Sequence, residues 1–452
     1  MNQLESEAII DAFTQAGFSE LGVGKEELGV EEKLSVVVIN TCTVTSKADQ
    51  KARRVIRKAL ADYPDAKVIV TGCYAQLNKD EILKLDENES GRLSVIEKDK
   101  IINIIPTLLP HTPHSSLLTP NSSLLTNTSS SLNLFQFNPK KFSQHTRSFL
   151  KIQDGCDNHC TYCRIRLARG KSVSLEKEEV LSRLRVLEEN HAEAVLTGVN
   201  ISQYYERGYH TEAQRHGDEE SNIFGLGELL DYLLKGTEKI AIRLSSLDPQ
   251  CINKDFAGVL AHKRIRPHFH LSVQSGCKSV LEKMGRSYDA KIIAKAVSLL
   301  RHAKKDPFLA CDIIAGFPGE TQNEFEETYN LCEQMNFAWI HAFPYSKRPG
   351  TPAFSFSYAV HEADITDRVQ RLTELAWQGR ADYVQRWLGR EVDVLVEKGK
   401  KHGAYCSGVS ENYLKTVVQC EGKPPQPGTV LRCMLLEEGN FEEYDVLAAV
   451  TR

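Results

Sequence analysis

The sequence predicts an α/β protein of 452 residues in three parts: an N-terminal α/β domain, a central partial (β/α) barrel and a small C-terminal β-barrel. Three observations predict this fold class. The length favours two or three hydrophobic cores over one. Buried strand patterns alternate with amphipathic helix patterns through most of the chain, which is typical of parallel sheets. The last stretch instead carries short strand patterns separated by Gly, Pro and Asn turns, as in small antiparallel barrels.

The N-terminal domain is expected over residues 1–106. Residues 3–16 carry apolar side chains at helical spacing, and residues 48–63 form a second predicted helix. Continuous apolar runs at 33–42 and 66–73 predict two buried parallel strands, which end at Cys42 and Cys73. Because the carboxyl ends of parallel strands meet at one edge of a sheet, we expect the two thiols to lie near each other and near a site. Two buried structural thiols are the alternative.

A low-complexity linker is expected over residues 107–138, which are rich in Ser, Thr, Asn and Pro and contain no Lys, Arg, Asp or Glu. The central barrel follows over residues 139–385, with about six strand–helix units and a polar loop at 206–222. Its predicted strands are 148–156, 192–200, 239–249, 268–276, 307–320 and 337–346, and its predicted helices are 176–191, 224–236, 289–303 and 321–335. The C-terminal barrel is expected over residues 386–452, with strands at 391–397, 413–420, 428–437 and 442–450.

Bulk composition restricts the cellular location and the chemistry. No apolar run approaches the roughly 20 residues that a membrane helix needs, and the opening MNQLESEAII is too polar for a signal peptide. We therefore expect a cytoplasmic protein with no membrane contact, in which the 12 cysteines stay reduced. In such a compartment, metal binding or redox chemistry is a more frequent use of clustered cysteines than disulfides.

The net charge of −4 gives no global attraction to polyanions, but two stretches are locally basic. Residues 47–58 hold six Lys or Arg against Asp49, and residues 139–172 hold eight against Asp154 and Asp157. Two solvated faces would explain these runs. A polyanionic substrate is the sharper hypothesis.

The segment KIQDGCDNHCTYCRIRLARG, residues 151–170, places Cys156, Cys160 and Cys163 in a CxxxCxxC pattern. A structural zinc ion needs four ligands, and His159 adjoins Cys160, which is a poor position for binding the same ion. A [4Fe-4S] cluster is normally held by four thiolates, so three leave one iron open for a substrate. The triad therefore predicts a catalytic iron–sulfur cluster, with zinc as the alternative.

The triad resembles that of the radical S-adenosylmethionine enzymes, and the segments LTGVN, SLDP, SVQSG and DIIAGFPGE follow in the order found in that superfamily. The resemblance implies that the three cysteines hold a [4Fe-4S] cluster whose open iron binds S-adenosylmethionine. It also implies an external electron donor, which drives cleavage of the sulfonium. Carried over to this sequence, the four segments imply cofactor contacts by Gly198, Asn200, Ser246, Gln274, Asp312, Gly316 and Gly319.

The chain further resembles the methylthiotransferases over nearly its whole length outside 107–138, in segments such as INTCTVTSKADQKARRVIRKA, VTGCYAQ, RLSSLDP and FPYSKRPGTPA. This resemblance implies a C-terminal barrel of the TRAM type and conversion of a C–H carbon to C–S–CH₃. It implies a second, auxiliary [4Fe-4S] cluster that supplies the sulfur, with Cys42 and Cys73 among its ligands. The segment NTCTVTSKAD is similar to the branch that acts on N6-threonylcarbamoyladenosine at tRNA position 37.

A tRNA partner would explain the two basic stretches, because phosphate contacts come from Lys and Arg. Three arginines follow the triad directly. Our hypothesis is that they clamp a phosphate or the threonylcarbamoyl carboxylate of the substrate. They are Arg164, Arg166 and Arg169.

The sequence departs from the family pattern at its start. The first auxiliary cysteine of the family lies in an LGCxxNQ-type segment after the first strand, and this sequence begins MNQLESEAI, within that segment. A misassigned start is one explanation. The other is a chain whose auxiliary cluster has two of its usual thiolates, which keeps open cleavage of S-adenosylmethionine without sulfur insertion. Methylthiolation of isopentenyladenosine tRNA or of a ribosomal protein, and RNA binding without catalysis, are separate alternatives.

Other histidines and cysteines have simpler interpretations. His268 and His270 share one face of a predicted strand, as a solvated pair or as a pair that faces the substrate. The remaining cysteines fall in apolar or strand contexts, where we expect small buried side chains. Cys311, which precedes Asp312 on a barrel strand, is the one to check for proximity to the auxiliary cluster. The sequence leaves the oligomeric state undetermined.

Overall fold

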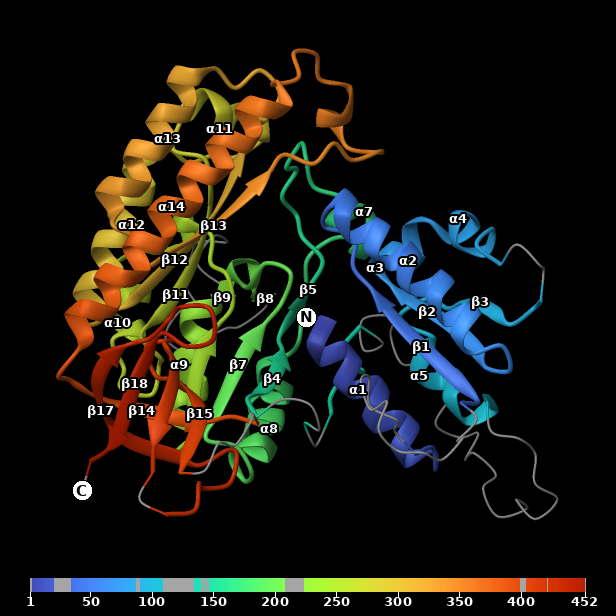
Figure 1. Cartoon of the computed structure of the whole chain (residues 1–452), viewed down its shortest axis with the longest axis horizontal. Helices are drawn as coiled ribbons and strands as arrows, with labels where there is room; N and C mark the ends of the chain where they lie inside the picture. Colours follow the sequence, from blue (N-terminus) through green and yellow to red (C-terminus); the bar gives the residue numbers. More distant parts are fainter. Residues whose placement is uncertain are drawn as a thin grey trace, which may run out of the picture. The chain divides into compact units, whose positions relative to one another are not determined.

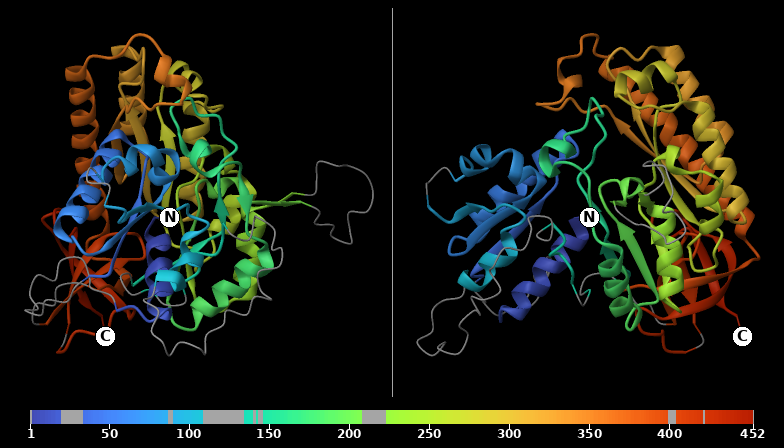
Figure 2. Two further views of the ribbon diagram at one scale, coloured as in Figure 1. Left: turned by 90° about the vertical axis from the view of Figure 1, so that its right-hand side faces the viewer. Right: turned by 180° about the vertical axis from the view of Figure 1, so that it is seen from behind.

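The structure is a computed structural model that describes residues 2–19, 34–86, 90–108, 134–139, 142, 146–207, 223–398, 404–420 and 422–451. The chain divides into two compact units, and Figures 1 and 2 show their ribbons. The first unit comprises residues 1–141 with 164–171, and the second comprises 142–163 with 172–452. In the described ranges, no helix is long and apolar enough to cross a bilayer.

The first unit is built on a three-stranded parallel sheet with the order β1-β2-β3. Helices α2, α3 and α4 supply the core on one face, around Ile56, Val68 and Val70, while α1 and α5 pack around Ile69 on the other. Both strands predicted here are confirmed, and so are both helices. The strands are β1 (Val36–Thr41), β2 (Lys67–Gly72) and β3 (Leu93–Val95), and the helices are α1 (Asn2–Gln15), α2 (Ser46–Asp62), α3 (Cys73–Leu77), α4 (Lys79–Leu83), α5 (Ile101–Ile104) and the 3-10 helix η1 (Ile105–Leu108).

The end of the predicted linker belongs to this core. Phe135 and Phe137 are buried, and Phe137 packs with Ile9 and Ile69. Residues 107 and 108 lie in η1, and 109–133 fall outside the described residues. The linker prediction is therefore wrong for the two phenylalanines, because a polar composition averaged over 32 residues hid the apolar ones at its end.

The second unit contains the central barrel, which is open and has six parallel strands. One sheet has the order β10-β7-β4 and the other β11-β12-β13. Two isolated parallel bridges, Ile242–Ile265 and Leu247–Leu271, join the segments that contain β10 and β11. All six predicted strands are confirmed. They are β4 (Ser148–Lys151), β7 (Glu193–Thr197), β10 (Ala241–Leu244), β11 (His268–Gln274), β12 (Phe308–Ala315) and β13 (Trp339–Pro344).

Helices follow the barrel strands, as the alternating pattern predicts. Side chains cap several of them: Asp289 accepts hydrogen bonds from two amides of α12, and Thr321 forms a capping box with Glu324 in α13. These helices are α8 (Lys177–Glu188), α9 (Leu226–Gly236), α10 (Lys254–Leu260), α11 (Lys278–Met284), α12 (Ala290–Ala303) and α13 (Gln322–Met335). Shorter elements in the connections are β5 (Gln153–Asp154), α7 (Ile165–Arg169), β6 (Val173–Ser174), η3 (Ile201–Gln203), β8 (Tyr205–Arg207), β9 (Ile223–Gly225), η5 (Pro249–Cys251) and η6 (Pro352–Ser355).

The C-terminal barrel is closed and has five strands in the order β14-β15-β16-β18-β17. Four of them were predicted. The fifth, β15, contains Ser407, Gly408 and Ser410, which weaken its strand pattern. The strands are β14 (Glu391–Val396), β15 (Tyr405–Ser410), β16 (Lys415–Gln419), β17 (Val430–Glu438) and β18 (Val446–Val450).

A buried ionic network joins the two barrels at the amino ends of the central strands. Glu193, the first residue of β7, accepts hydrogen bonds from Arg243 at 2.7 Å and Arg266 at 2.8 Å. Arg243 also donates to the backbone carbonyls of Ser410 and Glu411 in the C-terminal barrel. Burial alone would raise the pKa of Glu193, but the arginines outweigh it and lower that pKa to about 2. The C-terminal barrel is therefore fixed to the end of the central barrel opposite its carboxyl mouth.

His268 is part of this junction. Its ring stacks on Tyr413 of the C-terminal barrel at a centroid distance of 3.9 Å, and burial holds its pKa well below the ordinary value. Neither predicted role, a solvated pair or a substrate-facing pair, applies to His268. The sequence pattern placed it on one face with His270 but contained no sign of the barrel that covers it.

The long helix α14 (Glu362–Trp387) was not predicted, and it packs closely on the β13 edge of the barrel. A Cβ on Gly379 would lie 2.2 Å from the carbonyl oxygen of Phe337, so glycine allows this approach. We expect Gly379→Ala to lower the free energy of unfolding by about 1–3 kcal/mol, the usual cost of overpacking. Denaturant unfolding measures the change.

Gly258 in α10 is the matched control, because a Cβ there meets nothing within 4 Å. Gly258→Ala should leave stability unchanged or raise it by about 0.5–1 kcal/mol, the ordinary helix preference for alanine. Equal effects of the two substitutions would contradict the close packing at Gly379.

Candidate active site

The loop that carries the cysteine triad lies at the carboxyl mouth of the central barrel. The amide of Asp157 donates to Gln203 in η3, which follows β7. The amide and hydroxyl of Thr161 donate to carbonyls at the end of α11, which follows β11. The amide of Ala353 in η6, which follows β13, donates to the carbonyl of Thr161. Segments that leave three different strand ends thus hold one loop, and this is where (β/α) barrels place their active sites.

Cys156, Cys160 and Cys163 are not in disulfides and are partly exposed. Burial raises the pKa of Cys160, and the neighbouring Cys156 raises it further, whereas Arg286 lowers it. Arg286 also donates to the hydroxyl of Tyr162 at 2.9 Å and pairs with Asp248 at 3.3 Å. The cation of Arg286 therefore lies where it can offset the negative charge that thiolates bring into this loop.

A glycine lets the triad loop approach the barrel. Gly285 has φ of +75°, and a Cβ there would lie 2.9 Å from the carbonyl oxygen of His159. The left-handed conformation and the close contact both favour glycine. The arrangement of the loop therefore depends on this position as well as on the cysteines.

Gly198 and Asn200 are held together after β7 by one side chain. Gln153 accepts a hydrogen bond from the amide of Asn200 at 2.9 Å, and a Cβ on Gly198 would lie 2.8 Å from the same amide oxygen. Gln153 also donates to Ser172 at 2.8 Å. The turn that the sequence assigns to cofactor binding is thus fixed by a buried residue that sequence reasoning missed.

Ser246 and Asp312 are brought together through His270. The Ser246 hydroxyl lies 3.0 Å from Nδ1 of His270, and Nε2 of the same ring lies 3.0 Å from Asp312. His341 on β13 lies alongside, with its ring centroid 5.1 Å from that of His270. In the sequence, the alternation along β11 was the signal that pointed to His270. It left two roles open for His268 and His270: a solvated pair or a pair that faces the substrate. The structure places His270 between two predicted cofactor contacts on neighbouring barrel strands.

The three remaining predicted cofactor residues lie at the ends of β11 and β12. Gln274 is buried and adopts φ of +67° where the β11–β12 register shifts. The amide of Gly316 donates to Glu320 at 2.7 Å, and Arg368 of α14 pairs with Glu320 at 2.8 Å. The amide of Gly319 donates to the carbonyl of Tyr358. These contacts form a rigid turn at the barrel mouth, and α14 braces it.

In the first unit, the sheet brings Cys42 and Cys73 together. They directly follow Thr41 and Gly72, which are register partners at the ends of β1 and β2. Burial raises the pKa of Cys42, and the nearby Cys73 contributes to the increase. Gly72 has φ of +96°, and a Cβ there would lie 2.3 Å from the carbonyl oxygen of Thr41. The prediction that the two thiols share one sheet edge is confirmed.

The arginines after the triad do not form one exposed group. Residues 164–171 are grouped by their contacts with the first unit, where α7 packs against α3. Arg164 reaches Asn78 at 3.5 Å. Arg169 is buried and donates to the sulfur of Cys73 at 3.2 Å and to Glu5 at 3.1 Å. Arg166 lies in the last turn of the same helix and is partly exposed.

The basic stretch at 139–172 is less solvated than its composition indicates. Lys151 is buried in a pair with Asp154, and Arg147 pairs with Glu397. Together with Arg169, these cations compensate internal acids. The stretch at 47–58 is different, because α2 exposes Lys47, Lys51, Arg54, Arg57 and Lys58.

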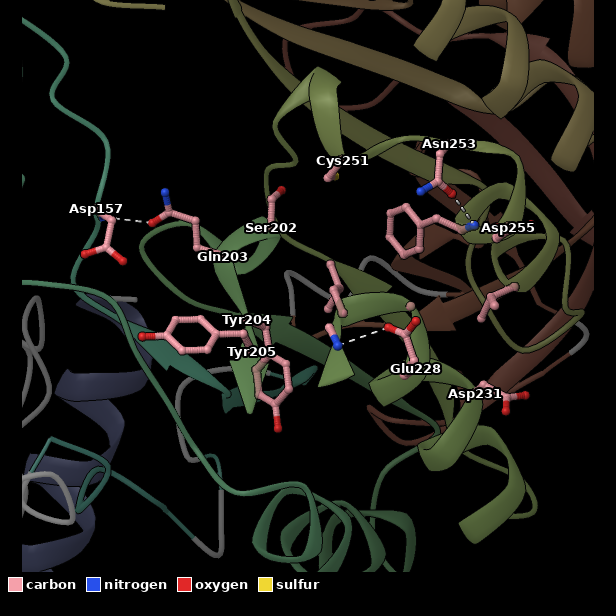
Figure 3. Close-up of a pocket in the computed structure, with 15 residues that line it drawn as sticks. Asp157, Ser202, Gln203, Tyr204, Tyr205, Glu228, Asp231, Cys251, Asn253 and Asp255 are labelled. Carbon is pink, nitrogen blue, oxygen red and sulfur yellow. Dashed lines mark hydrogen bonds between the residues drawn. The ribbon is translucent and has the colours of Figure 1, made fainter. Parts of the chain in front are cut away.

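Six of the seven remaining cysteines are buried, as expected. Cys311 is within hydrogen-bonding reach of Cys332 of α13, in the second unit, so it faces that helix. Cys251 is only partly buried and lines a pocket of about 630 Å³ beside α9 and α10, shown in Figure 3. Glu228, Asp231 and Asp255 also line this pocket, so its charge does not suit a polyanion.

Three cysteines in one loop and two at one sheet edge offer the thiols that iron–sulfur clusters take as ligands. Within the described ranges, no group of three or more His, Cys, Asp or Glu side chains could hold one metal ion. Thiolates of a [4Fe-4S] cluster bind separate irons, so three cysteine thiols along one loop fit that group. Cys42 and Cys73 provide two further thiols of the same kind.

Comparison with known proteins covers the segments that contain both cysteine groups. The Radical SAM superfamily model matches residues 150–332, and the model described as uncharacterized protein family UPF0004 matches residues 1–91. Threonylcarbamoyladenosine tRNA methylthiotransferase MtaB of Treponema pallidum (strain Nichols) is 36% identical over 496 aligned positions, which cover 97% of each chain. The chain belongs to the MtaB family.

A second MtaB relative, from Bacillus subtilis (strain 168), is 32% identical over 444 positions and covers 97% of this chain and 92% of its own. Among solved structures, the radical S-adenosylmethionine methyltransferase TsrM from Kitasatospora setae aligns with a TM-score of 0.49 and 14% identity, over 76% of this chain and 73% of that one. Membership of the MtaB family thus rests on sequence similarity along the whole chain.

Proposed function

We propose that this protein is a tRNA methylthiotransferase that converts C2–H of N6-threonylcarbamoyladenosine at position 37 of tRNA to C2–S–CH₃. The observation that carries the proposal is the full-length similarity to MtaB, 36% identity over 97% of the chain. The position of the cysteine triad at the barrel mouth supports it, because a reaction on a bound nucleotide needs that access.

The chain's own residues have distinct roles in this proposal. Cys156, Cys160 and Cys163 hold the barrel cluster, and Cys42 and Cys73 are ligands of the auxiliary cluster. When reduced by an external donor, a three-thiolate cluster with an open iron supplies radical chemistry from S-adenosylmethionine. Gly198, Asn200 and Gln274 and the glycines after β12 shape the S-adenosylmethionine pocket. The Ser246–His270–Asp312 chain fixes polar groups toward the same mouth.

A cytoplasmic tRNA partner follows from this activity. Helix α2 offers five exposed Lys or Arg side chains, and each phosphate contact makes affinity fall with salt. We propose that α2 contacts the tRNA backbone. By contrast, Arg147 and Lys151 form ion pairs with acidic residues of the chain, and we do not include them among the tRNA contacts.

The test uses anaerobically reconstituted protein, S-adenosylmethionine and dithionite with three forms of one tRNA. The tRNA carries N6-threonylcarbamoyladenosine, isopentenyladenosine or unmodified adenosine at position 37. Mass spectrometry of the digested nucleosides should show a methylthio group only on the threonylcarbamoyl form. Methylthiolation of the isopentenyl form alone would contradict the substrate, and S-adenosylmethionine cleavage with no product would contradict sulfur transfer.

A further inference from the structure

Arg169 lies at the centre of a buried charge cluster under Cys73. Its Nε donates to the Cys73 sulfur at 3.2 Å, and its Nη1 donates to Glu5 of α1 at 3.1 Å. Lys98 binds the same carboxylate oxygen of Glu5 at 2.5 Å. The exposed fractions of the Arg169 and Glu5 side chains are 5% and 2%. The guanidinium therefore has a fixed direction, which α1 sets from one side and the end of β2 from the other.

This geometry argues against a role for Arg169 in clamping substrate. A substrate anion would have to displace both Glu5 and Cys73 to reach the guanidinium. The guanidinium donates both to the Glu5 carboxylate and to the Cys73 sulfur, so an anion bound at Cys73 would lie within reach of its positive charge. A thiolate-ligated iron–sulfur group at Cys73 is such an anion.

Hydrogen bonds to cysteine sulfur, and charges close to it, affect the reduction potential of iron–sulfur clusters and how well they retain iron. Donors to the sulfurs help to set the reduction potential, and residues that orient metal ligands contribute to metal retention. A fixed cation stabilises the reduced cluster more than the oxidised one, because reduction adds negative charge. Such a donor at Cys73 should therefore make the cluster easier to reduce and slower to lose iron.

We propose that Arg169 is a positioning residue of the auxiliary cluster, which orients the Cys73 ligand and raises the reduction potential of that cluster. Glu5 and Lys98 hold the guanidinium in this role. The inference rests on the proposed function only in requiring that Cys73 ligates an iron–sulfur cluster. We therefore assign Arg169 to the auxiliary cluster, although this residue follows the cysteine triad in sequence.

The experiment uses the full chain with Cys156, Cys160 and Cys163 replaced by alanine, so that only the auxiliary cluster can load. In this background we compare the parent, which keeps Arg169, with Arg169→Gln, Arg169→Lys and the control Lys171→Gln. The control removes one exposed cation two residues away. Iron and sulfide content, iron loss to a chelator and the midpoint potential from spectroscopic titration are measured, and circular dichroism checks folding.

Arg169→Gln should shift the midpoint potential to a more negative value and lose iron about 10-fold faster. Arg169→Lys, which keeps the charge, should recover part of the shift, and Lys171→Gln should match the parent. Unchanged potential and iron loss in Arg169→Gln would overturn the inference while the proposed function stands. A parent that holds no iron in this background would instead contradict the proposed auxiliary cluster, and the inference with it.

Discussion

Cys160→Ser is expected to remove the barrel cluster and, with it, all cleavage of S-adenosylmethionine. Cys160 is the middle cysteine of a loop that is held by hydrogen bonds from three strand ends, and we propose that all three cysteines bind the cluster. Serine is also a much poorer ligand for iron than a thiolate. The variant should lose about four irons per chain. Its formation of 5′-deoxyadenosine under dithionite should fall below detection.

Cys251→Ser is the matched control, because this cysteine is also partly buried in the barrel unit but lies outside the triad loop. Its iron content and cleavage rate should equal those of the unmodified protein. Retention of full iron by Cys160→Ser would mean that the triad does not hold the cluster. Loss of iron in both variants would point to unfolding, which circular dichroism would reveal.

Glu193→Gln should lower the free energy of unfolding by about 3–5 kcal/mol, because it leaves Arg243 and Arg266 buried without their shared carboxylate. Since Arg243 also reaches the C-terminal barrel, the loss should loosen the junction between the two barrels. Denaturant unfolding measures the stability, and hydrogen exchange in β15 reports the junction. Glu326→Gln removes the carboxylate of a much more exposed pair with Arg371 and should cost about 0–1 kcal/mol.

The same carboxylate gives a pH dependence of known sign. The pKa of Glu193 is about 2 in the folded protein, against an ordinary 4.5. The ionised Glu193 carboxylate therefore contributes about 3 kcal/mol to the free energy of unfolding. This contribution is complete above about pH 4.5 and is lost as the pH falls toward 2. The stability difference between the unmodified protein and Glu193→Gln should narrow as the pH falls from about 6 to about 3. A difference that is constant over this range would contradict the low pKa.

Much of the fold could be predicted because its signals are local. Continuous apolar runs identified the parallel strands of both α/β parts. CxxxCxxC pointed to the loop of the proposed cluster, since cysteine spacing is a property of a short segment. The pairing of Cys42 with Cys73 followed from one topological rule about strand ends. Helix α14 and strand β15 were missed. Helix α14 lies outside the repeating strand–helix pattern, and strand β15 carries serine and glycine in place of β-branched residues.

By itself, the sequence determined where the candidate site residues lie along the chain: three thiols in one loop, two at strand ends, and glycine turns at the barrel mouth. Only the tertiary structure decided how their neighbours act. His268 and His270 are two residues apart, yet one is buried under Tyr413 and the other links Ser246 to Asp312. Arg169 follows the triad but meets Cys73 and Glu5, 96 and 164 residues away. Side-chain direction and burial depend on contacts between distant segments, and no local pattern in the chain encodes them.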